Sequence, residues 1–199
     1  MVQGEAKPLI LASGSPRRRQ VLTELGLHFV VIPASSDGPS QAINPAERVL
    51  DHARFKAQEV HQDHPEDWVL GADTMVFCEG LALGKAADVT EARQMIDRLV
   101  AAGGHEVWTG AALLGPGGQI HSRADVAKVS FRETPAAALD QYLAGEEWCD
   151  KAGAYAIQGW AGSFATLEQG WRGTVVGLAK EAVLGLYEAA GLPMPASGR

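Results

Sequence analysis

The sequence predicts an α/β protein in which helices cover one mixed β-sheet. Short apolar runs that suit buried strands alternate with amphipathic segments of helical period, and one hairpin-like insert interrupts this alternation. The 199 residues, 46% of them apolar, are enough to bury a sizeable core. No repeat, low-complexity tract or linker divides the chain, so we expect residues 1–199 to form a single domain.

The first elements follow from local signals. Residues 9–12 are a short apolar run typical of a buried strand. Ser15 suits an N-cap and Pro16 a first helical position, which predicts a helix from Pro16 to about Leu25. Residues 29–32 predict a second strand that ends at a proline.

A second capped helix begins at Asn44, which is followed by proline and, three residues later, by glutamate, and we expect this helix to extend to about Val60. Residues 68–77 predict two short strands interrupted at 71–73. The remaining predicted elements are a hairpin tip at 79–80 leading to a strand at 81–83, a helix at 90–100, a long hairpin of 105–114 and 126–131, a helix from about 135 to 144, a strand at 162–167 and a closing helix at 175–190.

Charge and composition exclude several classes of protein. The formal net charge of −7 disfavours a general nucleic-acid coat or an anionic-membrane binder, since both need the opposite sign. Cys78 and Cys149 form no CxxC pair, so neither a zinc knuckle nor a redox pair is supported. No apolar run approaches membrane-spanning length and residues 1–8 lack a signal-peptide pattern, so we expect a cytoplasmic protein.

The first candidate site is the turn from Ser13 to Arg18. A strand that enters a small-residue turn and a helix N-terminus exposes backbone N–H groups that can bind an anion. Arginines at 17–19 oppose the dipole of their own helix, which makes better sense if a negative ligand lies among them. A solvated arginine face is the plainer alternative, and the two interpretations are evenly balanced.

The second candidate is the carboxylate of Asp73, followed by Thr74, within an apolar run. A carboxylate there is costly to bury without a partner or a task, and it could bind a divalent metal or act as a general base. A strand-end aspartate that caps a backbone N–H is the simpler alternative. Asp37 is a second candidate metal ligand, although an Asx-turn explains it more simply.

The third candidate is a set of lysines with a small-residue loop. Lys56, Lys85 and Lys151 each look like surface lysines when taken singly. The loop at 150–159 is rich in glycine and alanine, and its Gln158 could recognise the edge of a ligand ring. A tight loop would explain the glycines but not the glutamine.

Four segments match one known family in order and spacing. They are Leu11-Ala12-Ser13-Gly14-Ser15-Pro16-Arg17-Arg18, Gly71-Ala72-Asp73-Thr74, Leu83-Gly84-Lys85 and Asp150-Lys151-Ala152-Gly153-Ala154-Tyr155-Ala156-Ile157-Gln158-Gly159. Together they closely resemble the Maf family of nucleoside triphosphate pyrophosphatases, also called septum formation proteins, and the resemblance extends from about residue 8 to 178.

The resemblance implies a two-lobed fold with a mixed, twisted sheet and a central cleft, related to the inosine-triphosphate pyrophosphatases. It also implies hydrolysis of a nucleoside triphosphate between its α- and β-phosphates, with Mg²⁺ or Mn²⁺ as the cofactor. Asp73 matches the family's proposed proton acceptor, and Asp73 with Asp37 matches the expected metal carboxylates. The phosphate-binding positions match Ser13, Arg17, Arg18, Lys56 and Lys85.

Substrate preference within the family follows three positions. Members of the dTTP/UTP type carry the residues that this sequence has as Arg17, Thr74 and Gln158, whereas the 7-methyl-GTP type resembles Trp, Gln and Glu there. We therefore expect a dTTP- and UTP-type enzyme. A broader action on modified nucleotides and a non-catalytic, nucleotide-binding role in cell division are the alternatives.

The sequence departs from the family pattern at three places. Gly38 replaces one of two adjacent acids, and Phe55 replaces a glutamate beside Lys56. Residues 170–179 lack the family's Ser, Tyr and Pro. We expect a small nucleotide as the binding partner, no nucleic-acid polymer or membrane, and a monomer or homodimer.

Overall fold

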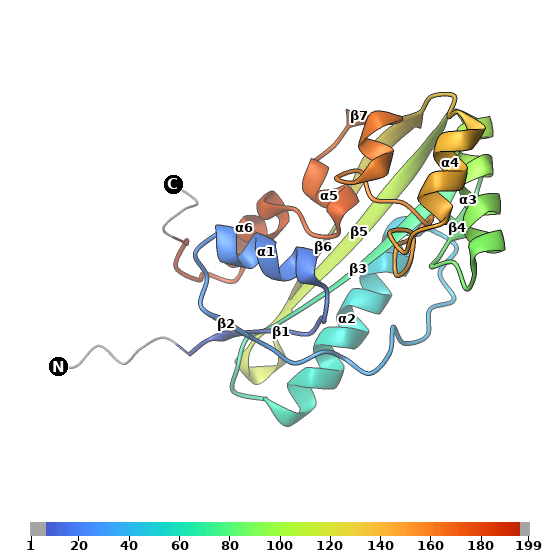
Figure 1. Ribbon diagram of the computed structural model, residues 1–199. Coiled ribbons are helices and arrows are strands. Elements are labelled where there is room, and N and C mark those ends of the chain that lie inside the picture. The colour runs from blue at the N-terminus through green and yellow to red at the C-terminus, as the bar shows by residue number, and fades with distance from the viewer. Residues whose placement is uncertain (1–6, 196–199) are drawn as a thin grey trace. The chain divides into compact units, whose positions relative to one another are not determined.

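The computed structural model describes residues 7–195 of the protein (Figure 1). Its strands are β1 (Leu9–Leu11), β2 (Phe29–Val31), β3 (Val69–Cys78), β4 (Leu81–Leu83), β5 (Gly104–Leu114), β6 (Ile120–Phe131) and β7 (Ala165–Gln169). Its α-helices are α1 (Pro16–Glu24), α2 (Pro45–Asp63), α3 (Val89–Ala102), α4 (Ala136–Leu143), α5 (Arg172–Val176) and α6 (Lys180–Ala189). Short 3₁₀ turns occupy Pro116–Gly118 and Trp160–Ser163.

The strands form one mixed sheet, as predicted. Its order is β2-β1-β3-β5-β6-β7, and β4 pairs with β3 off this path. β1 is parallel to both β2 and β3, whereas the β3–β4 and β6–β7 pairs are antiparallel. The fold is therefore a mixed α/β fold.

The chain divides into two compact units, which are described separately. Within the described residues, unit 1 comprises 7–73, 110–124 and 177–195, and unit 2 comprises 74–109 and 125–176. The expectation of a single domain over residues 1–199 stays a prediction.

Unit 1 has helices on both faces of its strands, because its apolar residues alternate between the faces. Ile10 and Val69 belong to a core cluster with Ala53 and Ala57 of α2. The next residues of the same strands belong to a second cluster, formed with α1 and α6; it includes Leu11, Leu70, Leu22, Val183 and Leu186. The near-continuous apolar runs of these strands reflect this burial on both sides.

Unit 2 has one core cluster of its own. α3, a helix that the sequence predicted, contributes its buried residues, and α4 contributes Leu139, Tyr142 and Leu143. These side chains pack with strand residues that include Val107 and Val129.

Several predicted boundaries were wrong. β6 begins at Ile120 and not at residue 126, and β7 covers Ala165–Gln169 and not 162–167, since Trp160–Ser163 forms a 3₁₀ turn. The expected break at residues 71–73 does not exist, since β3 continues through it from Val69 to Cys78. The expected helix at 175–190 is two helices, α5 and α6, separated at Gly177, whose φ of 120° is incompatible with a helix. Gly71 thus lies within a continuous strand, whereas Gly177 ends a helix.

Other local predictions were confirmed. Asn44 caps α2 by accepting hydrogen bonds from the N–H groups of Ala46 and Glu47. Residues 79 and 80 form the tip of the β3–β4 hairpin, both with positive φ.

Among residues 7–195, no helix has the length and apolar character needed to cross a membrane.

Candidate functional site

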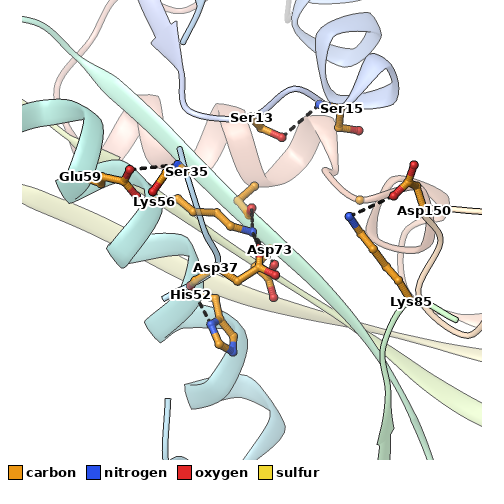
Figure 2. Close-up of polar contacts among 12 residues, drawn as sticks. Ser13, Ser15, Ser35, Asp37, His52, Lys56, Glu59, Asp73, Lys85 and Asp150 are labelled. Atoms are coloured by element: carbon orange, nitrogen blue, oxygen red, sulfur yellow. Dashed lines mark hydrogen bonds and ion pairs between the residues drawn. The ribbon is translucent and has the colours of Figure 1, made fainter. Parts of the chain in front are cut away.

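The charged centre of unit 1 is a lysine held between two carboxylates (Figure 2). The Lys56 Nζ lies 2.6 Å from Asp37 Oδ1 and 2.7 Å from Asp73 Oδ1. Lys56 and Asp73 are buried, whereas Asp37 is exposed. A buried ammonium and a buried carboxylate are tolerated because each neutralises the other, so Asp73 is an ion-paired residue and not a backbone cap.

A glycine allows the lysine to reach this carboxylate. α2 carries Lys56 and β3 carries Asp73, and the two elements approach most closely at Gly71. A Cβ at Gly71 would overlap the carbonyl oxygen of Ala53 and lie 2.8 Å from the nitrogen of Ala57, both in α2. The close packing of α2 against β3 therefore requires a glycine at position 71.

Side chains of α2 also hold the loop that carries Asp37. The His52 Nδ1 lies 2.8 Å from the carbonyl oxygen of Asp37, and since a carbonyl can only accept, this nitrogen carries the proton. Glu59 accepts a 2.9 Å hydrogen bond from the N–H of Ser35. Hydrogen bonds from the hydroxyl and N–H of Ser35 lower the pKa of Glu59. The two anchors fix the loop at Ser35 and at Asp37 itself.

The two departures from the family pattern at Gly38 and Phe55 are in contact. Gly38 has a φ of +74°, and a Cβ there would overlap the aromatic ring of Phe55. The ring fills the space that a side chain at position 38 would need. A side chain at position 38 and the Phe55 ring therefore exclude each other.

Asp37 and Asp73 fit a divalent cation. Both carboxylates reach the same ammonium, so they lie close enough to share one small cation. Mg²⁺ in phosphoryl-transfer sites is commonly held by one or two protein carboxylates and completed by phosphate oxygens and water. Among residues 7–195, no group of three or more His, Cys, Asp or Glu side chains is arranged to hold a metal.

Ser13 and Arg18 form a second polar cluster in unit 1. The buried Ser13 hydroxyl accepts hydrogen bonds from the Ser15 N–H, at 3.3 Å, and from the Arg18 guanidinium, at 2.9 Å. Arg18 also donates a 3.0 Å bond to the carbonyl of Gly177. Ser15 precedes α1 with extended backbone but makes no side-chain cap.

The charges around Arg18 connect this cluster to the carboxylates. Burial lowers the pKa of Arg18, the Asp73 charge acts in the opposite direction, Arg17 lowers it further and Asp37 raises it. Unit 1 thus brings together five predicted site residues from the β1–α1 turn and α1, the β2–α2 loop, α2 and β3, with Arg17 beside them. The five are Ser13, Arg18, Asp37, Lys56 and Asp73.

In unit 2, backbone pairing brings the Lys85 segment to the loop at 150–159. Lys85 and Ala152 form an antiparallel bridge, and the Gly153 N–H donates to the carbonyl of Gly84. The Lys85 Nζ lies 3.5 Å from Asp150, with both side chains exposed (Figure 2). Two motifs 65 positions apart in sequence thus become neighbours, although an exposed pair of this kind adds little stability.

Gln158 is exposed on a well-held part of this loop. On one side of it, Arg172 donates a hydrogen bond to the carbonyl of Ile157, and on the other the Glu147 carboxylate accepts one from the Trp160 N–H. The Trp160 ring stacks on Tyr142 at 4.3 Å. The backbone around Gln158 is fixed while its amide faces outward.

Thr74 lies in a line of hydroxyls that the sequence analysis did not identify. Its Oγ1 is 3.0 Å from the Oγ1 of Thr109 in β5, and the Thr109 hydroxyl donates to the carbonyl of Thr174 in α5 at 2.7 Å. Thr109 and Thr174 are buried. The sequence held no clear signal for Thr109, because β5 also carries His105 and Glu106 and a threonine does not stand out beside them.

The chain matches a known family and its members. Residues 8–190 match the family model described as Maf-like protein. The dTTP/UTP pyrophosphatase of Pyrococcus abyssi is 40% identical over 187 residues, covering 94% of this chain and 98% of the relative. The dTTP/UTP pyrophosphatase of Myxococcus xanthus is 41% identical over 190 residues, covering 94% of each.

A solved structure gives a weaker likeness. The Staphylococcus aureus Ham1 protein covers 92% of this chain and 97% of its own, at 10% identity and a TM-score of 0.49. That score is too low to bear on either fold or activity.

Proposed function

This chain belongs to the Maf family, and we propose that it hydrolyses dTTP and UTP to the nucleoside monophosphate and pyrophosphate. The observation that carries the proposal is the buried Lys56 held between Asp37 and Asp73, with the charge of Arg18 acting on the same carboxylates. Cations beside carboxylates are what a polyphosphate substrate and its hydrolytic water require. The names of the relatives supply the nucleotides.

Unit 1 supplies the groups for the phosphates. α1 begins after Ser15 without a side-chain cap, so its first N–H groups suit phosphate oxygens. Arg17 and Arg18 add positive charge, and Ser13 orients the Arg18 guanidinium. Lys85 is the cation that we assign to the phosphates from unit 2. Pyrophosphate, which carries several negative charges, then leaves against groups that already neutralise it.

Asp73 is the proton acceptor in this proposal. Its Oδ1 is held by Lys56, and we assign Oδ2 to the attacking water. The water oxygen bonds to the α-phosphorus, its proton passes to Asp73, and the bond from that phosphorus to the bridging oxygen breaks. The bonding electrons leave with pyrophosphate. A fixed carboxylate base of this kind contributes about 10²- to 10⁴-fold in rate.

Asp37 and Asp73 would hold the divalent cation, which when bound lowers the pKa of a coordinated water and offsets phosphate charge. The Lys56 ammonium between them keeps the two carboxylates together without excess negative charge. Their loop and strand are both anchored to α2, so the pair is positioned before any ligand arrives.

Thr74 and Gln158 read the base in this proposal. Both lie in unit 2, and neither carries a formal charge. A hydroxyl and an amide suit the edge of a pyrimidine, which offers both hydrogen-bond donors and acceptors. Action on modified pyrimidine triphosphates belongs to the same proposal, since these keep that edge.

The direct test is pyrophosphate release from a panel of dTTP, UTP, CTP, ATP, GTP and modified pyrimidine triphosphates, with Mg²⁺ or Mn²⁺. We expect dTTP and UTP to be cleaved fastest, with the monophosphate as the second product. Release of inorganic phosphate in place of pyrophosphate would contradict the proposed bond cleavage.

The matched variants are Asp73→Asn and Asp63→Asn. The first keeps the shape of the proton acceptor and should lower kcat by about 10²- to 10⁴-fold. The second removes the same charge from the end of α2 and should retain wild-type turnover. Equal turnover in Asp73→Asn and wild type would remove Asp73 from the mechanism.

A further inference from the structure

The hydrogen bonds that join Thr74, Thr109 and the Thr174 carbonyl in unit 2 run in one direction. A carbonyl oxygen can only accept, so the 2.7 Å contact from Thr109 Oγ1 to the Thr174 carbonyl uses the single proton of the Thr109 hydroxyl. Thr109 then has only lone pairs for Thr74, 3.0 Å away. The hydrogen bond between the two threonines therefore runs from Thr74 to Thr109.

This direction determines what Thr74 offers to a ligand. Its only hydroxyl proton is committed to the protein interior, so toward a base its oxygen is an acceptor. The donor on the Watson–Crick edge of uracil and thymine is the imide N3–H. Cytosine has an unprotonated N3 at the same place. This nitrogen is an acceptor, so it cannot form a hydrogen bond with the Thr74 oxygen when that oxygen is also an acceptor.

We propose that Thr109 is a positioning residue that makes Thr74 an acceptor for the imide N3–H of uracil and thymine and so disfavours cytosine. The inference rests on the proposed function, and it adds a residue that touches no substrate. Thr109 is only 3% exposed and lies in β5, the sheet neighbour of the strand that carries Thr74, which holds the direction constant.

The geometry also supplies an internal control. Thr174 is fully buried, and its own hydroxyl has no hydrogen-bond partner among the described residues. Only its backbone carbonyl receives the Thr109 proton. Thr174→Val therefore removes a hydroxyl from the same neighbourhood while leaving the line of hydrogen bonds intact.

The test compares kcat/KM for UTP and CTP in variants of Thr109. Thr109→Val keeps the side-chain shape but removes the acceptor, so the Thr74 hydroxyl can rotate and donate to cytosine. We expect the UTP/CTP ratio to fall about 3- to 10-fold, the weight of one neutral hydrogen bond. Thr109→Ser and Thr174→Val should keep the wild-type ratio.

A double-mutant cycle separates positioning from a general structural effect. Thr74→Val should lower the ratio by itself, and adding Thr109→Val should then change it no further. If the Thr109→Val variant does not fold, Thr109→Ala removes the same hydroxyl. A Thr109→Val ratio equal to wild type, or an equal fall with and without Thr74, would overturn the inference.

Equilibrium binding of α,β-methylene UTP and CTP separates this inference from the proposed function. Wild-type protein that cleaves UTP but keeps its binding ratio in Thr109→Val would refute the role of Thr109 alone. Protein that prefers the UTP analogue through Thr109 but releases no pyrophosphate would refute the proposed function alone.

Discussion

Unit 1 and unit 2 bury different kinds of polar group. The buried polar side chains of unit 1 are Ser13, Lys56 and Asp73, two of them charged, whereas those of unit 2 are His105, Thr109 and Thr174. Burial lowers the pKa of His105 to about 4, so this imidazole is neutral at pH 7. One unit buries paired charges and the other buries neutral donors and acceptors.

This difference matches the two tasks of recognising a nucleotide. Phosphates and an attacking water need charge, and a buried charge is stable only beside its opposite, as in the pair of Lys56 and Asp73. A base edge has no net charge, so its recognition depends on the direction of hydrogen bonds, which is the role that we propose for Thr74 and Thr109. Disrupting the charged unit should therefore cost more than disrupting the neutral one.

The largest effect is expected for Lys56→Met. It leaves the buried Asp73 carboxylate without its partner, which should lower the free energy of unfolding by about 3–5 kcal/mol and abolish turnover. Denaturant unfolding measures the loss. Lys56→Met with Asp73→Asn removes both buried charges and should recover much of the stability but none of the activity. Equal stability of the single and double variants would contradict this explanation.

The stability of unit 2 should depend on pH through the buried His105. Burial lowers the pKa of His105 to about 4 in the folded protein, from 6.5 for an exposed histidine, so the unfolded chain binds the proton at a higher pH. The contribution of neutral His105 to the free energy of unfolding is fully present above pH 6.5. It is lost as the pH falls toward 4, and the total loss is about 3 kcal/mol.

Urea unfolding between pH 4 and 7 measures this dependence. His105→Gln keeps a side chain that can hydrogen-bond to the Tyr155 hydroxyl, now 2.7 Å from His105, but it cannot titrate. The stability of wild type should fall more steeply toward low pH than that of His105→Gln. Parallel pH dependences would show that His105 is not the responsible group.

Gly71→Ala should disturb the charged unit without changing a charge. The added methyl overlaps the Ala53 carbonyl and pushes α2 from β3, which should cost about 1–3 kcal/mol and reduce turnover through Lys56. Gly84→Ala is the matched control, because nothing lies within 4 Å of its added Cβ. Thermal unfolding that ranks the two variants equally would contradict the packing argument.

The smallest effect on stability is expected at the exposed pair of Lys85 and Asp150. A double-mutant cycle with alanine should give a coupling of at most about 1 kcal/mol, because solvent screens both groups. Lys85→Ala should nevertheless raise the KM for UTP, since Lys85 is assigned to the phosphates. A large stability coupling without a change in KM would make this lysine structural.

Local signals predicted most of the fold because each depends on a few neighbouring residues. The cap at Asn44 and the hairpin tip at Gly80 are examples. Gly71 was misjudged as a strand break, since its role depends on Ala53, eighteen positions earlier in sequence and adjacent only after folding. Gly177 was missed as a break within an otherwise helical pattern.

For the candidate site, too, local motifs were predictable and contacts between distant segments were not. Motifs identified Lys56, Asp37 and Asp73 as candidates, but only the fold places both carboxylates on one ammonium. Thr109 and the carbonyls of Thr174 and Gly177 were not identified, because a buried hydroxyl or a main-chain oxygen has no distinctive sequence pattern. Contacts between distant segments are what the linear pattern lacks.

The contact between Gly38 and Phe55 has a consequence for redesign of this loop. A side chain introduced at position 38 alone would overlap the aromatic ring of Phe55 and would need a positive φ. A smaller side chain at position 55 would remove the overlap but leave space beside the glycine. A carboxylate can therefore be introduced at position 38 only together with a change at position 55.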